Sequence, residues 1–172
     1  GDKIIAVGSP DEVRPRVELT SKTQIIDAEG KTVTPGLIDP HTHLIFGGSR
    51  EDEFYLRAQG ADYMEIMAAG GGILSSVRAT RAASLTELVA SGRQRLCWML
   101  RQGVTTVECK SGYGLDLETE LKQLEAVRIL QREQPVELVP TFLGAHAWPP
   151  EYQEDHQGYL EFLLDTVLPA VR

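Results

Sequence analysis

The sequence has few cysteines, few basic residues and no long apolar run, and each of these scarcities excludes a class of protein. Its two cysteines, Cys97 and Cys109, are not in a C-x-x-C spacing, which argues against a disulfide framework and for a reducing compartment. No apolar run approaches the roughly 18 residues of a membrane-spanning helix. The first residues, GDKIIAVGSPDE, lack the basic and apolar blocks of a targeting segment. We therefore expect a cytoplasmic protein.

The balance of charge narrows the choice of partners. The 172 residues include 17 Lys and Arg against 25 Asp and Glu, a formal net charge of −8. Nucleic acids and anionic membranes both need a basic surface, so neither is an expected partner. With 42% hydrophobic residues, the chain has enough apolar material for one domain with a core.

Residues 1–34 are predicted to form a small β region. Short β-prone runs fall at 3–7, 17–19, 23–27 and 31–34, with turn signals at 8–10 and 28–30. The region lacks the material for a sheet of its own.

After Pro35 the pattern changes to alternating strands and helices. The helix signal is strongest at 84–102, where Ser84 and Glu87 form a capping box, and Asp116 is placed to cap the next helix. The expected strands are 36–39, 104–107 and 136–143, and the expected helices are 51–68, 84–102, the segment from Asp116 to Pro135, and 159–168. A triple glycine at 70–72 predicts a mobile or closely approached loop. Connections of this length are crossovers, so we expect an α/β fold with a parallel sheet.

Two histidines lie at the end of the first of these strands, in TPGLIDPHTH, residues 34–43. In an extended chain residues i and i+2 point to the same side, so His41 and His43 can both face one metal ion. A turn with two ordinary histidines is the alternative that the spacing alone leaves open. Active sites of parallel α/β folds form at the carboxyl ends of strands, and imidazole suits zinc or iron, so we favour a metal site.

The next two strands also end in polar residues. Glu108 and the SGYG loop follow the second strand, and His146 follows the third. Tyr113, between two glycines, is either an exposed loop residue or a ring presented into a pocket. His146 either lies in a capped turn or polarises a carbonyl group. Glu108 is interpreted as a structural hydrogen-bond partner.

Arg50 follows His43 by seven residues, in a glycine-rich loop. It is either a solvated surface residue or a bidentate clamp for a substrate carboxylate. His156, in the polar segment QEDHQG, is interpreted as a solvated residue at the beginning of the last helix. Cys97 and Cys109 are interpreted as small core residues.

Taken together, these motifs resemble those of a known family. TPGLIDPHTH is similar to the first-strand signature of the amidohydrolase superfamily. The segments HTHLIFGGSREDEF, ECKSGYGLD and FLGAHAWPPEY, in this order, resemble the imidazolonepropionase family of histidine degradation. The resemblance extends over essentially the whole chain.

The resemblance implies a fold and a reaction. The fold is a TIM-like (β/α)8 barrel with a small β-sandwich, in which residues 1–34 form part of the composite sandwich domain and 35–172 form the N-terminal part of the barrel. The reaction is the metal-dependent hydrolysis of the cyclic amide of 4-imidazolone-5-propanoate to N-formimidoyl-L-glutamate. The implied substrate is therefore a small molecule, and the implied cofactor is one zinc or iron ion. The resemblance also leaves open whether the protein forms a homo-oligomer.

The same resemblance implies the role of individual residues. His41 and His43 match metal ligands, and Arg50 matches the group that binds the propionate carboxylate. Tyr113 and His146 match substrate-contacting positions, and His146 is the expected catalytic residue.

The chain is short for such a barrel, which takes about 250 residues. The family's later metal-ligating histidine and aspartate, and its glutamate base, have no counterpart here. We therefore expect a fragment that binds metal weakly and is inactive alone. The alternatives are another cyclic amidohydrolase or deaminase of the superfamily, or a non-catalytic piece that only assembles with other copies.

Overall fold

Residues 3–172 are described by a computed structural model, in which the chain divides into two compact units, Gly1–Pro35 and Gly36–Arg172. The division falls where the sequence pattern changes, after Pro35. The assignment of the first unit to a β-sandwich stays a prediction.

The first unit contains the short helix α1 (Pro10–Val13) and the 3-10 turn η1 (Arg14–Arg16). The strands predicted here are wrong, because residues 3–35 contain no strand and none of them is buried. A strand needs a partner for its backbone N–H and C=O groups, and this unit provides none. The predicted turn at 28–30 is confirmed: the Lys31 N–H donates to the Ala28 carbonyl over 2.8 Å. Glu29 and Gly30 have φ of 51° and 77°, as in a hairpin turn.

The second unit is built on a three-stranded sheet in the order β1 (Leu37–Thr42), β2 (Val104–Lys110) and β3 (Glu137–Thr141). Both pairs of neighbours are parallel, as predicted from the long crossovers. In register, Thr42 lies opposite Cys109, which lies opposite Pro140. The parallel α/β architecture is therefore confirmed, whereas a closed barrel is not present in residues 3–172.

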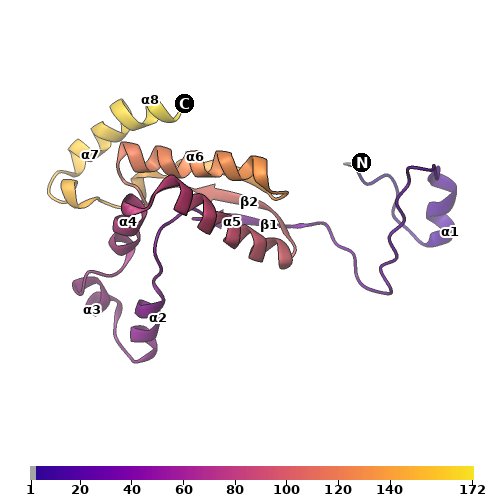
Figure 1. The fold of residues 1–172 in the computed structure, drawn as a ribbon, viewed down its shortest axis with the longest axis horizontal. Helices are drawn as coiled ribbons and strands as arrows, with labels where there is room; N and C mark the ends of the chain where they lie inside the picture. The colour runs from indigo at the N-terminus through magenta and orange to yellow at the C-terminus, as the bar shows by residue number, and fades with distance from the viewer. Residues whose placement is uncertain (1–2) are drawn as a thin grey trace. The chain divides into compact units, whose positions relative to one another are not determined.

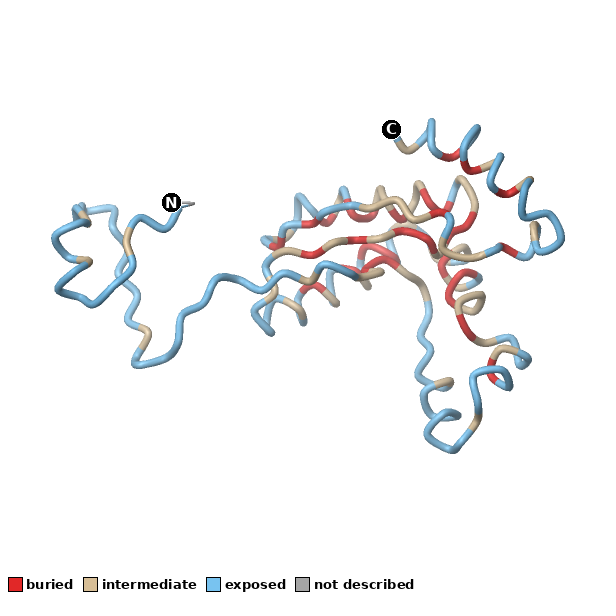
Figure 2. Tube along the Cα trace, turned by 180° about the vertical axis from the view of Figure 1, so that it is seen from behind, coloured by how far each residue is buried: buried red, intermediate tan, exposed pale blue. Residues whose placement is uncertain are grey.

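Two long helices cover this sheet, α5 (Leu85–Arg101) and α6 (Leu117–Glu133) (Figure 1). Both begin at the predicted caps: Ser84 and Glu87 form a reciprocal capping box, and the Asp116 carboxylate accepts from the Thr119 N–H over 2.7 Å. The shared core is apolar and gathers between the helices and the strands (Figure 2). It consists of Leu44, Ile45, Leu88, Val89, Leu96, Val107, Cys109, Ala126, Val127, Leu130, Val136 and Leu138.

Three shorter helices precede α5: α2 (Glu51–Ala58), α3 (Tyr63–Ala68) and α4 (Ile73–Ala82). The single helix predicted for 51–68 is wrong, because the chain turns at Gly60 and restarts with Asp62 accepting from the Glu65 N–H. Helix α4 was not predicted. The triple glycine before α4 is closely approached, since a Cβ at Gly72 would lie 2.1 Å from the Met67 sulfur.

After β3 the chain forms the short turns η2 (Gly144–His146) and η3 (Pro150–Tyr152). A continuous helical stretch follows, made of α7 (His156–Phe162), the π-helical turn η4 (Leu163–Val167) and α8 (Leu168–Val171). It begins earlier than the predicted 159, because Asp155 accepts from the Gly158 N–H over 2.9 Å. The Tyr159 hydroxyl donates to the Gly144 carbonyl over 2.6 Å, which fixes the turn before His146. Among residues 3–172, no helix combines the length and apolarity needed to cross a membrane.

Candidate metal and substrate site

His41 and His43 lie where β1 ends. His41 is exposed on the strand, His43 follows it half-buried, and their ring centroids are 6.1 Å apart. Two imidazoles on one tetrahedral zinc ion, with Zn–N distances of about 2.1 Å, place their centroids about 5.2 Å apart. The Thr42 hydroxyl between them donates to the Glu108 carbonyl over 2.7 Å, which attaches this end of β1 to β2. The two rings thus lie side by side at one strand end, about 1 Å farther apart than on a shared tetrahedral ion.

The His43 ring packs with two other rings, whose centroids lie 5.4 Å from each other. The Tyr113 ring stacks on it with centroids 4.6 Å apart, and the His146 ring stacks with centroids 4.4 Å apart and 12° between the planes. These three residues follow β1, β2 and β3. The structure thus brings together the side chains that the sequence placed at three strand ends.

The surroundings of His43 favour its neutral form. Burial and the imidazole of His146 lower the pKa of His43 to about 4. Its Nδ1 atom is buried and has no hydrogen-bond partner among the described residues. A neutral imidazole is the form that ligates a metal ion, and an unpaired buried nitrogen is costly without a partner. Both observations fit a metal ligand.

The donor set is nevertheless incomplete. Residues 3–172 contain no group of three or more His, Cys, Asp or Glu side chains placed to hold a metal ion. Metal sites in enzymes normally have at least three protein ligands. His41 and His43 therefore fit part of a site.

His146 is oriented by the loop after β2. Its Nδ1 lies 3.0 Å from the Gly112 carbonyl oxygen, which can only accept, so Nδ1 is the donor. This leaves Nε2 for another partner. The approach requires glycine at 112, because a Cβ there would lie 2.5 Å from the Leu143 oxygen, and the φ of Gly112 is +101°.

Arg50 and Tyr113 border a common cavity of about 480 Å³ next to His43. Arg50 precedes α2 and forms an ion pair with Glu53, Nη2 to Oε2 2.7 Å, which raises the pKa of the guanidinium. Its side chain is 41% exposed. Burial raises the pKa of Tyr113, so the phenol stays protonated. The cavity is lined by His43, Phe46, Gly48, Ser49, Arg50, Glu51, Ser76, Arg95, Trp98 and Tyr113.

Glu108 and His156 take the ordinary roles that the sequence predicted. The Glu108 carboxylate accepts from the Lys110 ammonium over 2.6 Å and from the Thr141 hydroxyl over 2.8 Å, and these bonds lower its pKa. His156 is exposed at the start of α7, where its ring stacks on Trp148 with centroids 3.9 Å apart.

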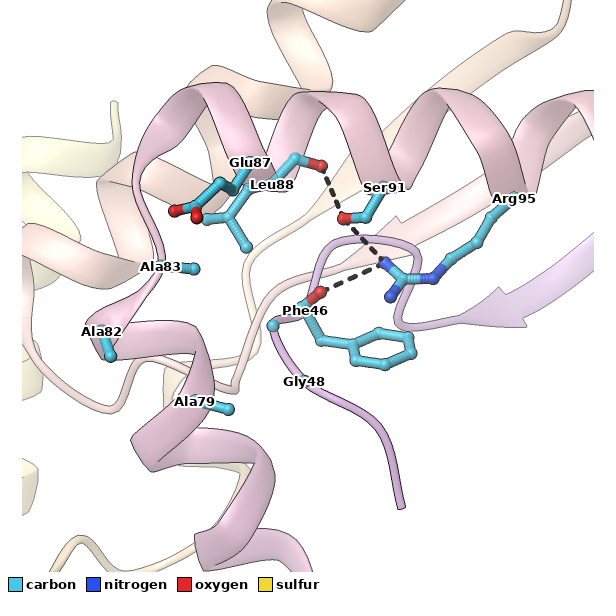
Figure 3. A pocket seen from close by; sticks show the side chains of 10 residues that line it. Phe46, Gly48, Ala79, Ala82, Ala83, Glu87, Leu88, Ser91 and Arg95 are labelled. Atoms are coloured by element: carbon cyan, nitrogen blue, oxygen red, sulfur yellow. Dashed lines mark hydrogen bonds between the residues drawn. The ribbon is translucent and has the colours of Figure 1, made fainter. Parts of the chain in front are cut away.

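Arg95 is a residue of this site that the sequence motifs do not indicate. Its guanidinium carbon lies 3.5 Å from the centre of the Phe46 ring, and Nη1 donates to the carbonyls of Leu44 and Phe46 over 2.9 and 3.2 Å. The two residues also border a second cavity, of about 370 Å³, between α4 and α5 (Figure 3). The signal was a charged residue seven positions after the buried Leu88, on the same face of the helix.

Glu120 and Gln123 on α6 were also missed. Both are buried, at 0% and 1% exposure, and both bond to the backbone of the loop that carries Tyr113. They continue the buried spacing of Val127 and Leu130 toward the start of the helix. Polar residues at positions where the helical spacing calls for apolar ones indicate buried polar side chains.

The family model and the relatives that match this chain agree on one kind of enzyme. A family model described as "Amidohydrolase family" matches residues 24–70. The chain is 56% identical over 171 residues to the imidazolonepropionase of Alkaliphilus metalliredigens, covering 99% of this chain and 40% of the relative. It is 53% identical to that of Geobacillus thermodenitrificans over 169 residues, 98% of this chain and 40% of the relative. It is 53% identical to that of Fusobacterium nucleatum over 171 residues, 99% of this chain and 41% of the relative.

These relatives confirm the resemblance that the motifs indicated. The similarity extends over almost the whole chain, and the chain spans about two fifths of the length of the curated relatives it matches.

Proposed function

We propose that this chain, a homologue of imidazolonepropionases, contributes part of the active site for hydrolysis of 4-imidazolone-5-propanoate to N-formimidoyl-L-glutamate in histidine degradation. The observation that supports this most is the cluster of the His43, Tyr113 and His146 rings at three strand ends, beside a cavity that Arg50 borders. In a parallel α/β fold this is the edge where substrates bind.

His41 and His43 would hold one zinc or iron ion. The position of both rings at the end of β1 and the unpaired Nδ1 of His43 support this assignment, and the complete protein would supply the remaining ligands. When bound, the ion would supply Lewis-acid polarisation of the ring carbonyl and a water of lowered pKa.

Arg50 would bind the propionate carboxylate. Its ion pair with Glu53 orients the guanidinium, and the Glu53 carboxylate is itself fixed by the Gly72 N–H over 3.0 Å. At 41% exposure the guanidinium keeps donors available for a carboxylate. Anchoring the side chain of the substrate orients its ring toward His43.

Tyr113 and His146 would contact the imidazolone ring. Tyr113 presents a protonated phenol from a glycine-rich turn that is held by hydrogen bonds to α6. His146, held by the Gly112 carbonyl through Nδ1, would in its imidazolium form donate the Nε2–H to charge that develops on the substrate carbonyl oxygen. His146 is thus the catalytic residue of this part of the site.

The proposal also covers the domain organisation, the localisation and the partners of the protein. Residues 1–34 are assigned to a composite β-sandwich and residues 35–172 to the N-terminal part of a (β/α)8 barrel. The enzyme acts in the cytoplasm on a small molecule and forms no complex with nucleic acid or membrane. Because only two metal ligands lie in the described residues, the 172-residue chain alone is inactive, and homo-oligomerisation is a route to cover its open sheet edges.

An assay of 4-imidazolone-5-propanoate hydrolysis tests this function. The complete protein that carries this chain, loaded with zinc or iron, is expected to form N-formimidoyl-L-glutamate, and the 172-residue chain alone is expected to form none. Turnover of another cyclic amide by the complete protein, with none of imidazolonepropanoate, would overturn the proposal.

A further inference from the structure

Gln123 connects the loop after β1 to the loop after β2. Its Nε2 donates to the Ile45 carbonyl over 2.7 Å, and its Oε1 accepts from the Tyr113 N–H over 3.3 Å. Ile45 follows His43 by two residues. The amide of one side chain therefore joins the two backbone segments that carry the stacked rings of His43 and Tyr113.

The environment of Gln123 makes this connection specific. The side chain is 1% exposed, and water cannot substitute for its partners there. Each end of the amide has its own partner, one acceptor and one donor, so a flip of the amide would break both bonds. A buried amide that uses both ends in this way holds its two partners at a fixed separation.

Glu120, one turn earlier on α6, stabilises the same loop from beside Gln123. Its buried carboxylate accepts from the backbone N–H groups of Gly114 and Leu115, both over 2.9 Å. Leu115 has a φ of +57°, which is strained for leucine and persists only where its surroundings fix it. Glu120 thus sets the shape of the Tyr113 loop, and Gln123 sets its position relative to His43.

We infer that Gln123 is a positioning residue for this site: it fixes the Tyr113 ring against the His43 ring and so sets the width of the substrate cavity between them and Arg50. The effect on catalysis rests on the proposed function. The effect on the two rings does not, because it follows from the hydrogen bonds and the 4.6 Å stack alone.

The test compares Gln123→Met, which keeps the size of the side chain and removes both hydrogen bonds, with Gln131→Met. Gln131 lies on the same helix, and its Oε1 also accepts from a backbone amide, that of Leu138 over 2.7 Å, but two turns farther from the site. NMR spectra of the 172-residue chain report the ring protons of His43 and Tyr113. The ring protons of His156, stacked on Trp148, serve as an internal reference.

In Gln123→Met the ring resonances of His43 and Tyr113 are expected to shift, while those of His156 stay in place. In Gln131→Met all three are expected to stay in place. In the complete enzyme Gln123→Met is expected to raise KM roughly tenfold, as for the loss of about 1.4 kcal/mol of binding, with kcat and metal content changed much less. A residue that only stabilised the fold would lower the unfolding temperature and leave KM unchanged.

Gln123→Glu provides a second variant if the methionine variant does not fold. At pH 8 its carboxylate keeps the acceptor for the Tyr113 N–H and loses the donor to the Ile45 carbonyl, so the His43 resonances are expected to shift. Unshifted His43 and Tyr113 resonances in a folded variant would overturn the inference, whatever the activity. An inactive wild-type enzyme with shifted resonances in the variants would overturn the proposed function and leave the positioning role supported.

Discussion

The imidazole rings of His43 and His146 lie almost parallel, with centroids 4.4 Å apart and 12° between their planes. His43 follows β1 and His146 follows β3, and β2 separates these two strands in the sheet. The stack therefore reaches across the end of β2, and the Tyr113 ring, from the loop after β2, packs against both, with centroids 4.6 Å from His43 and 5.4 Å from His146. Three strand ends thus meet in one cluster of rings.

Gly112 allows this cluster to close, so Gly112→Ala is expected to lower the free energy of unfolding by at least about 3 kcal/mol. The cost combines an unfavourable φ of +101° with a Cβ 2.8 Å from the His146 Cβ. Gly103→Ala is the matched control, because Gly103 also has a positive φ, +89°, but its Cβ would meet nothing closer than 3.9 Å. It is expected to cost about 1–2 kcal/mol. Equal losses in urea unfolding would show that the close approach at Gly112 has no energetic weight.

Glu120→Gln is expected to destabilise the chain by about 2 kcal/mol, the scale of hydrogen bonds to a charged group. The buried carboxylate accepts from the N–H groups of Gly114 and Leu115, and an amide would turn its own NH2 group toward them. Glu118→Gln, at an exposed position in the same turn of α6, is expected to change stability by less than about 1 kcal/mol. Chemical denaturation measures both, and a Glu120→Gln variant as stable as Glu118→Gln would contradict the role of the carboxylate.

Arg50→Ala is expected to raise KM for imidazolonepropanoate roughly 10- to 100-fold in the complete enzyme, the range for losing a hydrogen bond to a charged group. Metal content is expected to stay the same, because a protonated guanidinium group has no lone pair to offer a metal ion. Arg57→Ala, an exposed arginine in the last turn of α2, is the control and is expected to leave KM unchanged. Steady-state kinetics that give the same KM for wild type and Arg50→Ala would remove Arg50 from the substrate site.

The two cysteines are expected to differ sharply in reactivity. Cys97 is exposed, whereas Cys109 is 1% exposed and burial raises its pKa to about 12. Alkylation at pH 8 is therefore expected to modify one thiol in the native chain and two in urea, with Cys97→Ser losing the native signal. Since Cys109 ionises more easily when unfolded, its contribution to stability falls as the pH rises from about 9 toward 12. Rapid modification of two thiols in the native chain would contradict the buried position of Cys109.

The parts of the fold that the sequence predicted are those with local signals. Ser84 with Glu87, and Asp116, cap helices where the capping pattern indicated, because a cap involves residues three positions apart. The residues at the ends of β1, β2 and β3 meet because parallel strands share one carboxyl edge.

The parts that the sequence missed depend on contacts between distant residues. The β-prone runs at 3–7 and 23–27 do not form strands. A strand needs a neighbouring strand to bond its backbone groups, and residues 3–35 contain none. Glu120 and Gln123 appeared as ordinary polar residues of a helix, and only the packing of α6 against two loops buries them. Cys97, predicted as a core residue, is exposed, because it lies on the outer face of α5.

The central claim, that His41 and His43 ligate a metal ion, is tested most directly by the metal content of the complete protein and its single variants. Wild type and His156→Ala, whose ring stacks on Trp148 at the start of α7, are expected to carry about one equivalent of zinc or iron. His41→Ala and His43→Ala are each expected to lose most of it. Retention of a full equivalent by both of these variants would contradict the account.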